Sequence, residues 1–148
     1  MASLFPREGG CRCGKVRFRL TENPLITAAC HCRGCQRMSA SAFSVTAIMP
    51  PTGLEIIAGE TVIGGLHGEL KHHFCGWCMS WVFTEPGVGM VNVRSTLLDD
   101  PEGFAPFIET MTAEKLSWAV TPAAHSFEGF PAEADFGPLM AAYAARQA

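Results

Sequence analysis

The sequence carries little charge and no long apolar run. Charged residues make up 17% of the 148 residues, and the formal net charge is -3. This acidic balance and the absence of a basic cluster argue against nucleic acid as a partner. No segment approaches the roughly 18 consecutive apolar residues that a transmembrane helix needs. We therefore expect neither a nucleic-acid partner nor a membrane association.

The first ten residues lack the apolar core of a secretory signal peptide. A cytoplasmic location is the default expectation, and in that reducing compartment cysteines favour metal sites over disulfides. The chain is long enough to bury a core of its own, and we expect a single domain over residues 1–148. A charged fraction below the usual quarter leaves room for a partner surface, such as that of a homo-oligomer.

Seven cysteines, an odd number, fall into three groups. Two groups are close pairs, and the third places three thiols within six residues. The groups are Cys11 and Cys13; Cys75 and Cys78; and Cys30, Cys32 and Cys35. Clustered cysteines at these spacings are typical of zinc sites, in which Zn²⁺ binds thiolates tetrahedrally at about 2.3 Å.

The two pairs together supply four thiolates, enough for one closed structural zinc site that couples metal binding to folding. The group of three leaves one tetrahedral position free, which distinguishes a reactive zinc from a structural one. Several alternatives remain open. In one alternative, the cysteines of the two pairs are ordinary buried residues; in another, Cys75 and Cys78 form a redox pair. For the group of three, the alternative is a second closed site with His31, His72 or His73 as its fourth ligand.

Two arginines, Arg33 and Arg37, lie beside the group of three cysteines. A guanidinium group binds a carboxylate in a bidentate fork. The two arginines are therefore candidate contacts for a small anionic ligand that carries a thiol or a carboxylate. The alternative is that they lie on a solvated turn.

Short alternating segments predict a mainly β fold. Apolar and basic residues alternate over residues 15–20, which is the pattern of a half-buried strand. We expect further short strands at residues 26–29, 42–49, 54–57, 60–63, 70–74, 81–83 and 90–93. The two strands that flank Cys75-Gly76-Trp77-Cys78 predict a zinc-ribbon-like hairpin. Helical signals predict only a short helix after Asp99 and a C-terminal helix over residues 139–146.

These motifs resemble those of the glutathione-dependent formaldehyde-activating enzyme family, also called the centromere-protein-V-like family. The resemblance covers most of the chain and rests on residues 10–14, 30–39, 41–43, 73–78 and 98–101. It implies an Mss4-like zinc-binding β fold with short helical segments and a C-terminal helix.

The resemblance also implies two Zn²⁺ ions per chain. It assigns Cys11, Cys13, Cys75 and Cys78 to a structural zinc, and Cys30, Cys32 and Cys35 to a catalytic zinc. The implied activity is that of a carbon–sulfur lyase acting on a small thiol–aldehyde adduct such as S-(hydroxymethyl)glutathione, with glutathione as co-substrate. Arg33 and Arg37 would then contact the carboxylates of the peptide. The competing interpretation is a non-catalytic zinc-binding scaffold with the same fold.

Two positions depart from the family's pattern. After the last cysteine the family usually has Gly-Ser, where this chain has Met79-Ser80. The family's Ser-Gly-Ser segment is Ser39-Ala40-Ser41 here. Both departures lie beside cysteine turns, so the sequence predicts differences in backbone approach or in substrate fit at these two places.

Overall fold

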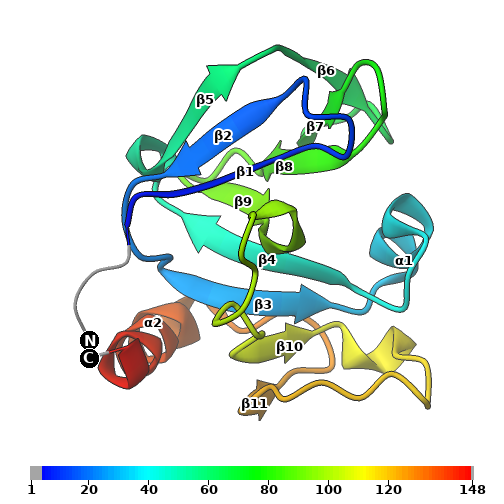
Figure 1. Cartoon of the computed structure of the whole chain (residues 1–148). Helices are drawn as coiled ribbons and strands as arrows, with labels where there is room; N and C mark the ends of the chain where they lie inside the picture. The colour runs from blue at the N-terminus through cyan, green and yellow to red at the C-terminus, as the bar shows by residue number, and fades with distance from the viewer. Residues whose placement is uncertain (1–4, 148) are drawn as a thin grey trace.

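A computed structural model describes residues 5–147. Two β-sheets and two α-helices form the framework (Figure 1). The strands are β1 (Arg7–Gly10), β2 (Arg17–Leu20), β3 (Ile26–Cys30), β4 (Ser44–Met49), β5 (Leu54–Ala58), β6 (Thr61–Gly64), β7 (Lys71–Cys75), β8 (Trp81–Glu85), β9 (Val91–Arg94), β10 (Ile108–Thr110) and β11 (His125–Ser126). The helices are α1 (Arg33–Ser39) and α2 (Glu133–Gln147), and three short 3-10 turns occupy Pro51–Gly53, Ser95–Leu97 and Thr112–Glu114.

The larger sheet has eight strands in the order β11-β10-β3-β4-β9-β8-β7-β6, and the smaller has three in the order β1-β2-β5. Neighbouring strands are antiparallel, except that β10 pairs in parallel with both β3 and β11. The parallel pairing brings the late strand β10 beside β3, far apart in sequence (Figure 1). Thr110 of β10 thus lies opposite Cys30, at the end of β3.

Two apolar cores hold the layers together. In the larger core, Phe18 and Leu20 of β2 pack with Val93 of β9, so the small sheet covers one face of the large one. In the smaller core, Ile108 of β10 packs with Tyr143 of α2. Burial of such side chains stabilises the fold by about 1.5–3 kcal/mol each.

The mainly β prediction is confirmed, and each expected strand is present with ends shifted by one or a few residues. The helix expected after Asp99 is wrong. A turn forms there instead, in which the Phe104 amide donates to the Pro101 carbonyl at 3.2 Å. The C-terminal helix begins at Glu133 rather than at residue 139, because acidic residues in its first turn suit the positive end of the helix dipole. Helix α1 was not expected from the sequence.

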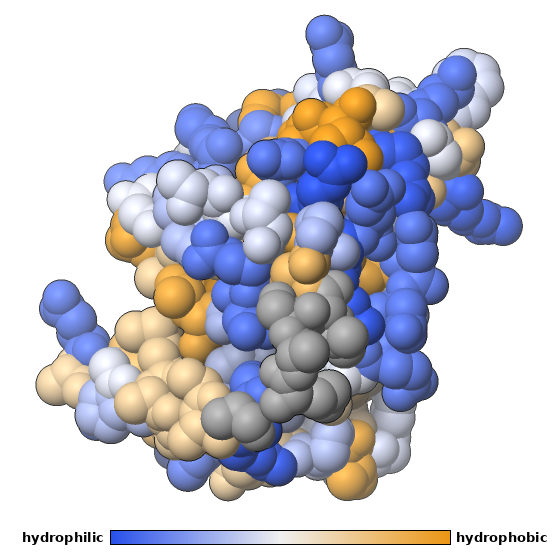
Figure 2. Space-filling model, turned by 60° about the vertical axis from the view of Figure 1, so that its left-hand side comes forward, coloured by the Kyte–Doolittle hydropathy of each residue, from blue (hydrophilic) through white to orange (hydrophobic). Residues whose placement is uncertain are grey.

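The surface mixes polar and apolar side chains. Figure 2 shows a face on which hydrophobic side chains gather in a few separate patches among hydrophilic ones. On the outer face of β2, Arg17 forms a two-pronged ion pair with Asp99 at 2.9 and 2.5 Å. Within residues 5–147, no helix is long and apolar enough to cross a membrane.

A buried polar network ties the loop after β3 to strand β10. His31 is fully buried, and its Nε2 lies 2.8 Å from Oε1 of Glu109. The same carboxylate accepts hydrogen bonds from Lys115 at 3.1 Å and from Ser126 at 2.6 Å. Burial raises the pKa of Glu109, but the hydrogen bonds from Ser126, Lys115 and His31 outweigh it and lower the pKa to about 2. Glu109 is therefore ionised at neutral pH and holds His31 in place.

The two departures from the family pattern share one backbone conformation. Ala40, which ends α1, has a φ angle of 51°, and Met79, in the turn after Cys78, has a φ angle of 60°. Both angles lie in the left-handed region, which glycine adopts without steric cost. At both positions the backbone has the conformation that suits the glycine of the family pattern, although Ala40 and Met79 each carry a Cβ atom.

Replacing Glu109 with Gln should destabilise the protein in a pH-dependent way. The folded pKa lies below the ordinary value of 4.5, so the carboxylate stabilises the fold above about pH 4.5 and loses that effect as the pH falls toward 2. We expect Glu109→Gln to lower the free energy of unfolding by about 2 kcal/mol at pH 7. Denaturant unfolding of both proteins at several pH values measures the difference, which should shrink below pH 4.5.

The exposed Glu128, changed to Gln, is the matched control and should leave the stability at pH 7 unchanged within about 0.5 kcal/mol. Equal stabilities of the wild type and Glu109→Gln at pH 7 would contradict the role assigned to Glu109.

Replacing Ala40 with Gly should stabilise the protein, because it removes the Cβ clash of the left-handed conformation at the end of α1. We expect the free energy of unfolding to rise by about 1 kcal/mol, measured by denaturant unfolding. Ala58→Gly in strand β5, where φ is not positive, should change it in the opposite direction. A loss of stability in Ala40→Gly would argue against strain at this position.

Candidate metal centres

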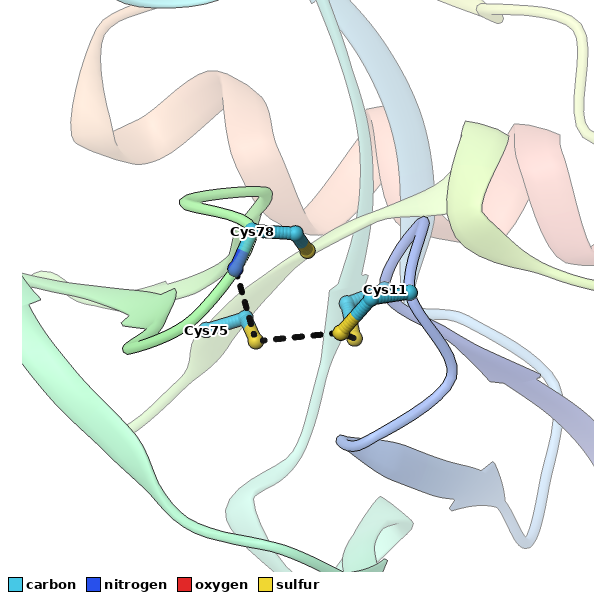
Figure 3. Close-up of side chains that lie close together, drawn as sticks. Cys11, Cys75 and Cys78 are labelled. Carbon is cyan, nitrogen blue, oxygen red and sulfur yellow. Dashed lines mark hydrogen bonds between the residues drawn. The ribbon is translucent and has the colours of Figure 1, made fainter.

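The first candidate centre joins four thiols from two separate turns. Cys11 and Cys13 lie between β1 and β2, whereas Cys75 ends β7 and Cys78 lies in the turn before β8. The four sulfur atoms all lie within 4.8 Å of one another. Figure 3 shows the side chains of Cys11 and Cys75 directed toward each other from these two turns. The predicted zinc-ribbon-like hairpin is therefore present, and the N-terminal turn completes its cysteine group.

Backbone amides point at the sulfur atoms of this group. The amide of Val16 lies 3.2 Å from Sγ of Cys11. Those of Trp77 and Cys78 lie 3.4 and 3.5 Å from Sγ of Cys75. Hydrogen bonds of this kind favour the negatively charged thiolate, which is the form that binds metal.

The spacing of the sulfur atoms fits a tetrahedral zinc. Four sulfurs about 2.3 Å from one ion lie about 3.8 Å apart at the corners of a tetrahedron. The sulfur of Cys13 lies 3.5 Å from that of Cys11 and 3.8 Å from that of Cys75. These distances leave room for one such ion and match the donor set that Zn²⁺ prefers.

The thiols of this group have widely separated pKa values. A hydrogen bond from the Ser80 hydroxyl is the largest cause that lowers the pKa of Cys78, to about 5. The backbone amide of Lys15 lowers the pKa of Cys13, but burial and the neighbouring thiols outweigh it and raise the pKa to about 11. Closely spaced thiols cannot all ionise together without a cation. A divalent metal supplies that charge.

The second candidate centre lies where β3 meets α1. Cys30 ends β3, Cys32 precedes α1, and Cys35 lies in its first turn. The three sulfurs lie within 4.8 Å of one another, and all three residues are half-buried. The Cys35 amide donates to Sγ of Cys32 at 3.2 Å. The hydrogen bond with Cys35 lowers the pKa of Cys30 to about 5, and the same contact raises the pKa of Cys35.

The histidines that were considered as a fourth ligand lie elsewhere. Within residues 5–147, no histidine or carboxylate belongs to the group of three thiols. His31, His72 and His73 each contact another side chain at 2.8 Å: Glu109, Thr84 and Thr61, respectively. The geometry therefore offers three protein ligands here, against four at the first centre.

Arg33 and Arg37 are both exposed on α1. The Arg33 side chain donates to the amide oxygen of Gln36, and both arginines line an open cavity of about 390 Å³ together with Trp118. Trp118 is 70% exposed. The two arginines thus lie next to the three-cysteine centre along the chain, but they face this cavity rather than a carboxylate of the protein.

Sequence reasoning did not single out Glu109. The signal was an acidic residue directly after an apolar stretch, residues 104–108, which leads into β10. A buried strand tolerates an ionised carboxylate only where hydrogen bonds compensate for lost hydration. That rule predicts a partner for Glu109, but only the parallel pairing of β10 with β3 identifies it as His31.

Comparisons with known proteins identify the family of this chain. The sequence profile of the family described as "Glutathione-dependent formaldehyde-activating enzyme" matches residues 6–114, well over half of the chain and all seven cysteines. A protein of Halomonas elongata named "Putative glutathione-dependent formaldehyde-activating enzyme" is 25% identical over 140 residues, covering 85% of this chain and 89% of that protein.

A solved structure is similar in fold. A crystal structure of a Rhodobacter sphaeroides protein has a TM-score of 0.50 and 22% identity, covering 62% of this chain and 87% of that one. The mainly β fold and the two cysteine groups are consistent with the family whose profile matches residues 6–114. The chain belongs to the glutathione-dependent formaldehyde-activating enzyme family.

Proposed function

We propose that this protein is a zinc-dependent enzyme of the carbon–sulfur lyase type. Its substrate would be a small thiol–aldehyde adduct similar to S-(hydroxymethyl)glutathione. The observation that carries this proposal is the presence of two distinct cysteine groups, one with four thiols and one with three. Family membership and the name of the Halomonas elongata relative support it.

The two groups would have different roles. The four thiols of the first centre saturate a tetrahedral ion, so a zinc bound there would be structural. The second centre offers Cys30, Cys32 and Cys35 and leaves one position for a substrate atom. A Zn²⁺ ion bound at these three thiols supplies a Lewis acid and favours the thiolate form of a bound thiol.

The proposed reaction balances without another reactant. A thiol sulfur forms a bond to the aldehyde carbon, the carbonyl double bond becomes a single bond, and the thiol proton ends on the oxygen. The reverse reaction breaks the carbon–sulfur bond. Binding both reactants at one site raises their effective concentration, and this would increase the rate of adduct formation and cleavage.

The surrounding residues would position the substrate. The contact between Glu109 and His31 holds the residue between Cys30 and Cys32 in place, which would keep the sulfur atoms at their spacing. Arg33 and Arg37, on the exposed face of α1, would bind the carboxylates of a glutathione-like substrate.

Replacing Cys32 with Ala should remove one zinc and leave the fold intact. We expect native mass spectrometry to find two zinc ions in the wild type and one in Cys32→Ala, with similar far-UV circular dichroism. Cys75→Ala is the contrasting variant. It breaks the four-cysteine centre between the two sheets and should lower the melting temperature by 10 °C or more. Global unfolding of Cys32→Ala would count against separate roles for the two centres.

The zinc-loaded protein should accelerate the glutathione-dependent loss of formaldehyde over the spontaneous rate. We expect Cys32→Ala to lower this acceleration by about 100-fold or more, because its metal chemistry is lost. Consumption of formaldehyde is followed by nuclear magnetic resonance, with glutathione but no protein as the reference. Two bound zinc ions with no acceleration for glutathione or smaller thiols would favour the non-catalytic scaffold.

A further inference from the structure

A cavity of about 520 Å³ reaches from α1 to the turn after Cys78. Ser39 at the end of α1 and Ser44 of β4 line one side, and Ser80 lines the other. Its size falls within the usual range for small-molecule sites. Ser44 is paired directly opposite Cys30 across the β3–β4 ladder, so the cavity borders the three-cysteine centre.

One charged residue lines this cavity, and it is Arg94. Arg94 lies opposite Thr46 of β4, two residues from Ser44 on the same face of the sheet. Because residues two apart along a strand share a face, Arg94 and Cys30 lie on the same side of the large sheet. Within residues 5–147, no acidic side chain lines the cavity.

The Arg94 guanidinium group is buried without an anionic partner. Arg94 is 7% exposed, and its guanidinium carbon lies 4.1 Å from the centre of the Trp81 ring. Its one hydrogen bond within the described part of the chain goes to the Asn92 carbonyl at 3.4 Å, and Nε has no partner there. No carboxylate among residues 5–147 lies within ion-pair distance of it. Burial lowers the pKa of Arg94 to about 10, which leaves it charged at neutral pH.

An unpaired buried charge is unfavourable unless an anion joins it. Any negative charge on Cys35 or Cys30 raises the pKa of Arg94 and so opposes the effect of burial, which agrees with the position of Arg94 on the same side of the sheet as Cys30. The thiolates compensate only in part, because a zinc ion bound to the three thiols would reduce their net charge to -1. A guanidinium group that keeps free donors and faces a cavity is suited to bind a carboxylate in a bidentate fork.

We propose that Arg94, held against Trp81, binds a carboxylate of a small thiol substrate in this cavity. The substrate's sulfur would reach the three-cysteine centre from the same cavity. This inference rests on the proposed function for the thiol. Arg33 and Arg37 line a different cavity, so the carboxylate that binds Arg94 is not one of those proposed to bind these two arginines.

The test compares two probes that differ only in the carboxylate. N-acetyl-L-cysteine and its primary amide are titrated into the zinc-loaded full-length protein by calorimetry, without aldehyde. A charge-assisted pair with Arg94 should make the acid bind at least about tenfold more tightly than the amide. Equal binding of acid and amide to the wild type would overturn the proposal.

Two variants at Arg94 locate the effect. Arg94→Gln removes the charge and should reduce the preference for the acid to within about twofold. Arg94→Lys keeps a charge but lacks the fork, so its preference should fall between the two. Zinc content and melting temperature confirm that each variant is folded, and Arg94→Lys carries the test if Arg94→Gln is not.

Two further arginines provide controls. Arg146→Gln on the exposed side of α2 should leave the preference unchanged. Retention of the preference in Arg94→Gln, or its loss in Arg37→Gln instead, would overturn the assignment to Arg94. The measurement contains no aldehyde, so its result does not depend on the formaldehyde assay. Failure of that assay alone would overturn the proposed reaction and leave the carboxylate contact standing.

Discussion

Cys13 and Cys75 are 62 positions apart in the sequence, yet their sulfur atoms lie 3.8 Å from each other. This convergence fixes the turn between β1 and β2 against the hairpin of β7 and β8. The small sheet is thereby held over the large one, where Phe18 and Val93 close the main core. Hydrophobic burial and the convergence of the four thiols are coupled at this point, because neither sheet could shift without separating the thiols.

The two cysteine groups differ in what surrounds them. In the four-thiol group, Cys75 is 1% exposed and receives amide hydrogen bonds from its own turn, whereas Cys13 is exposed. The three-thiol group is half-buried throughout; Cys32 receives the Cys35 amide, and the neighbouring His31 contacts Glu109. The clearest difference is the number of thiols, because three protein ligands would leave a tetrahedral metal one open position.

The sequence was sufficient for features that depend on local pattern. Alternation along residues 15–20 predicts the buried face of β2, and cysteine spacing predicts both groups of thiols. Helix α1 escaped prediction because seven residues with a glycine and a serine carry little helical propensity. Arg94 and Glu109 escaped it because their significance comes from pairing between distant strands. The residues that contact Arg94 and Glu109 are determined by the order of the strands, and the sequence next to each residue does not indicate them.

The left-handed backbone at Ala40 and Met79 bears on how this family can be recognised. A sequence signature that demands glycine at both positions would reject this chain, although its backbone there is one that glycine suits. What the cysteine turns require is a φ angle, and a side chain can be tolerated at a cost of about 1–2 kcal/mol each. Natural variation at such positions can therefore move between glycine and larger residues while the shape of the backbone near the cysteine groups stays the same.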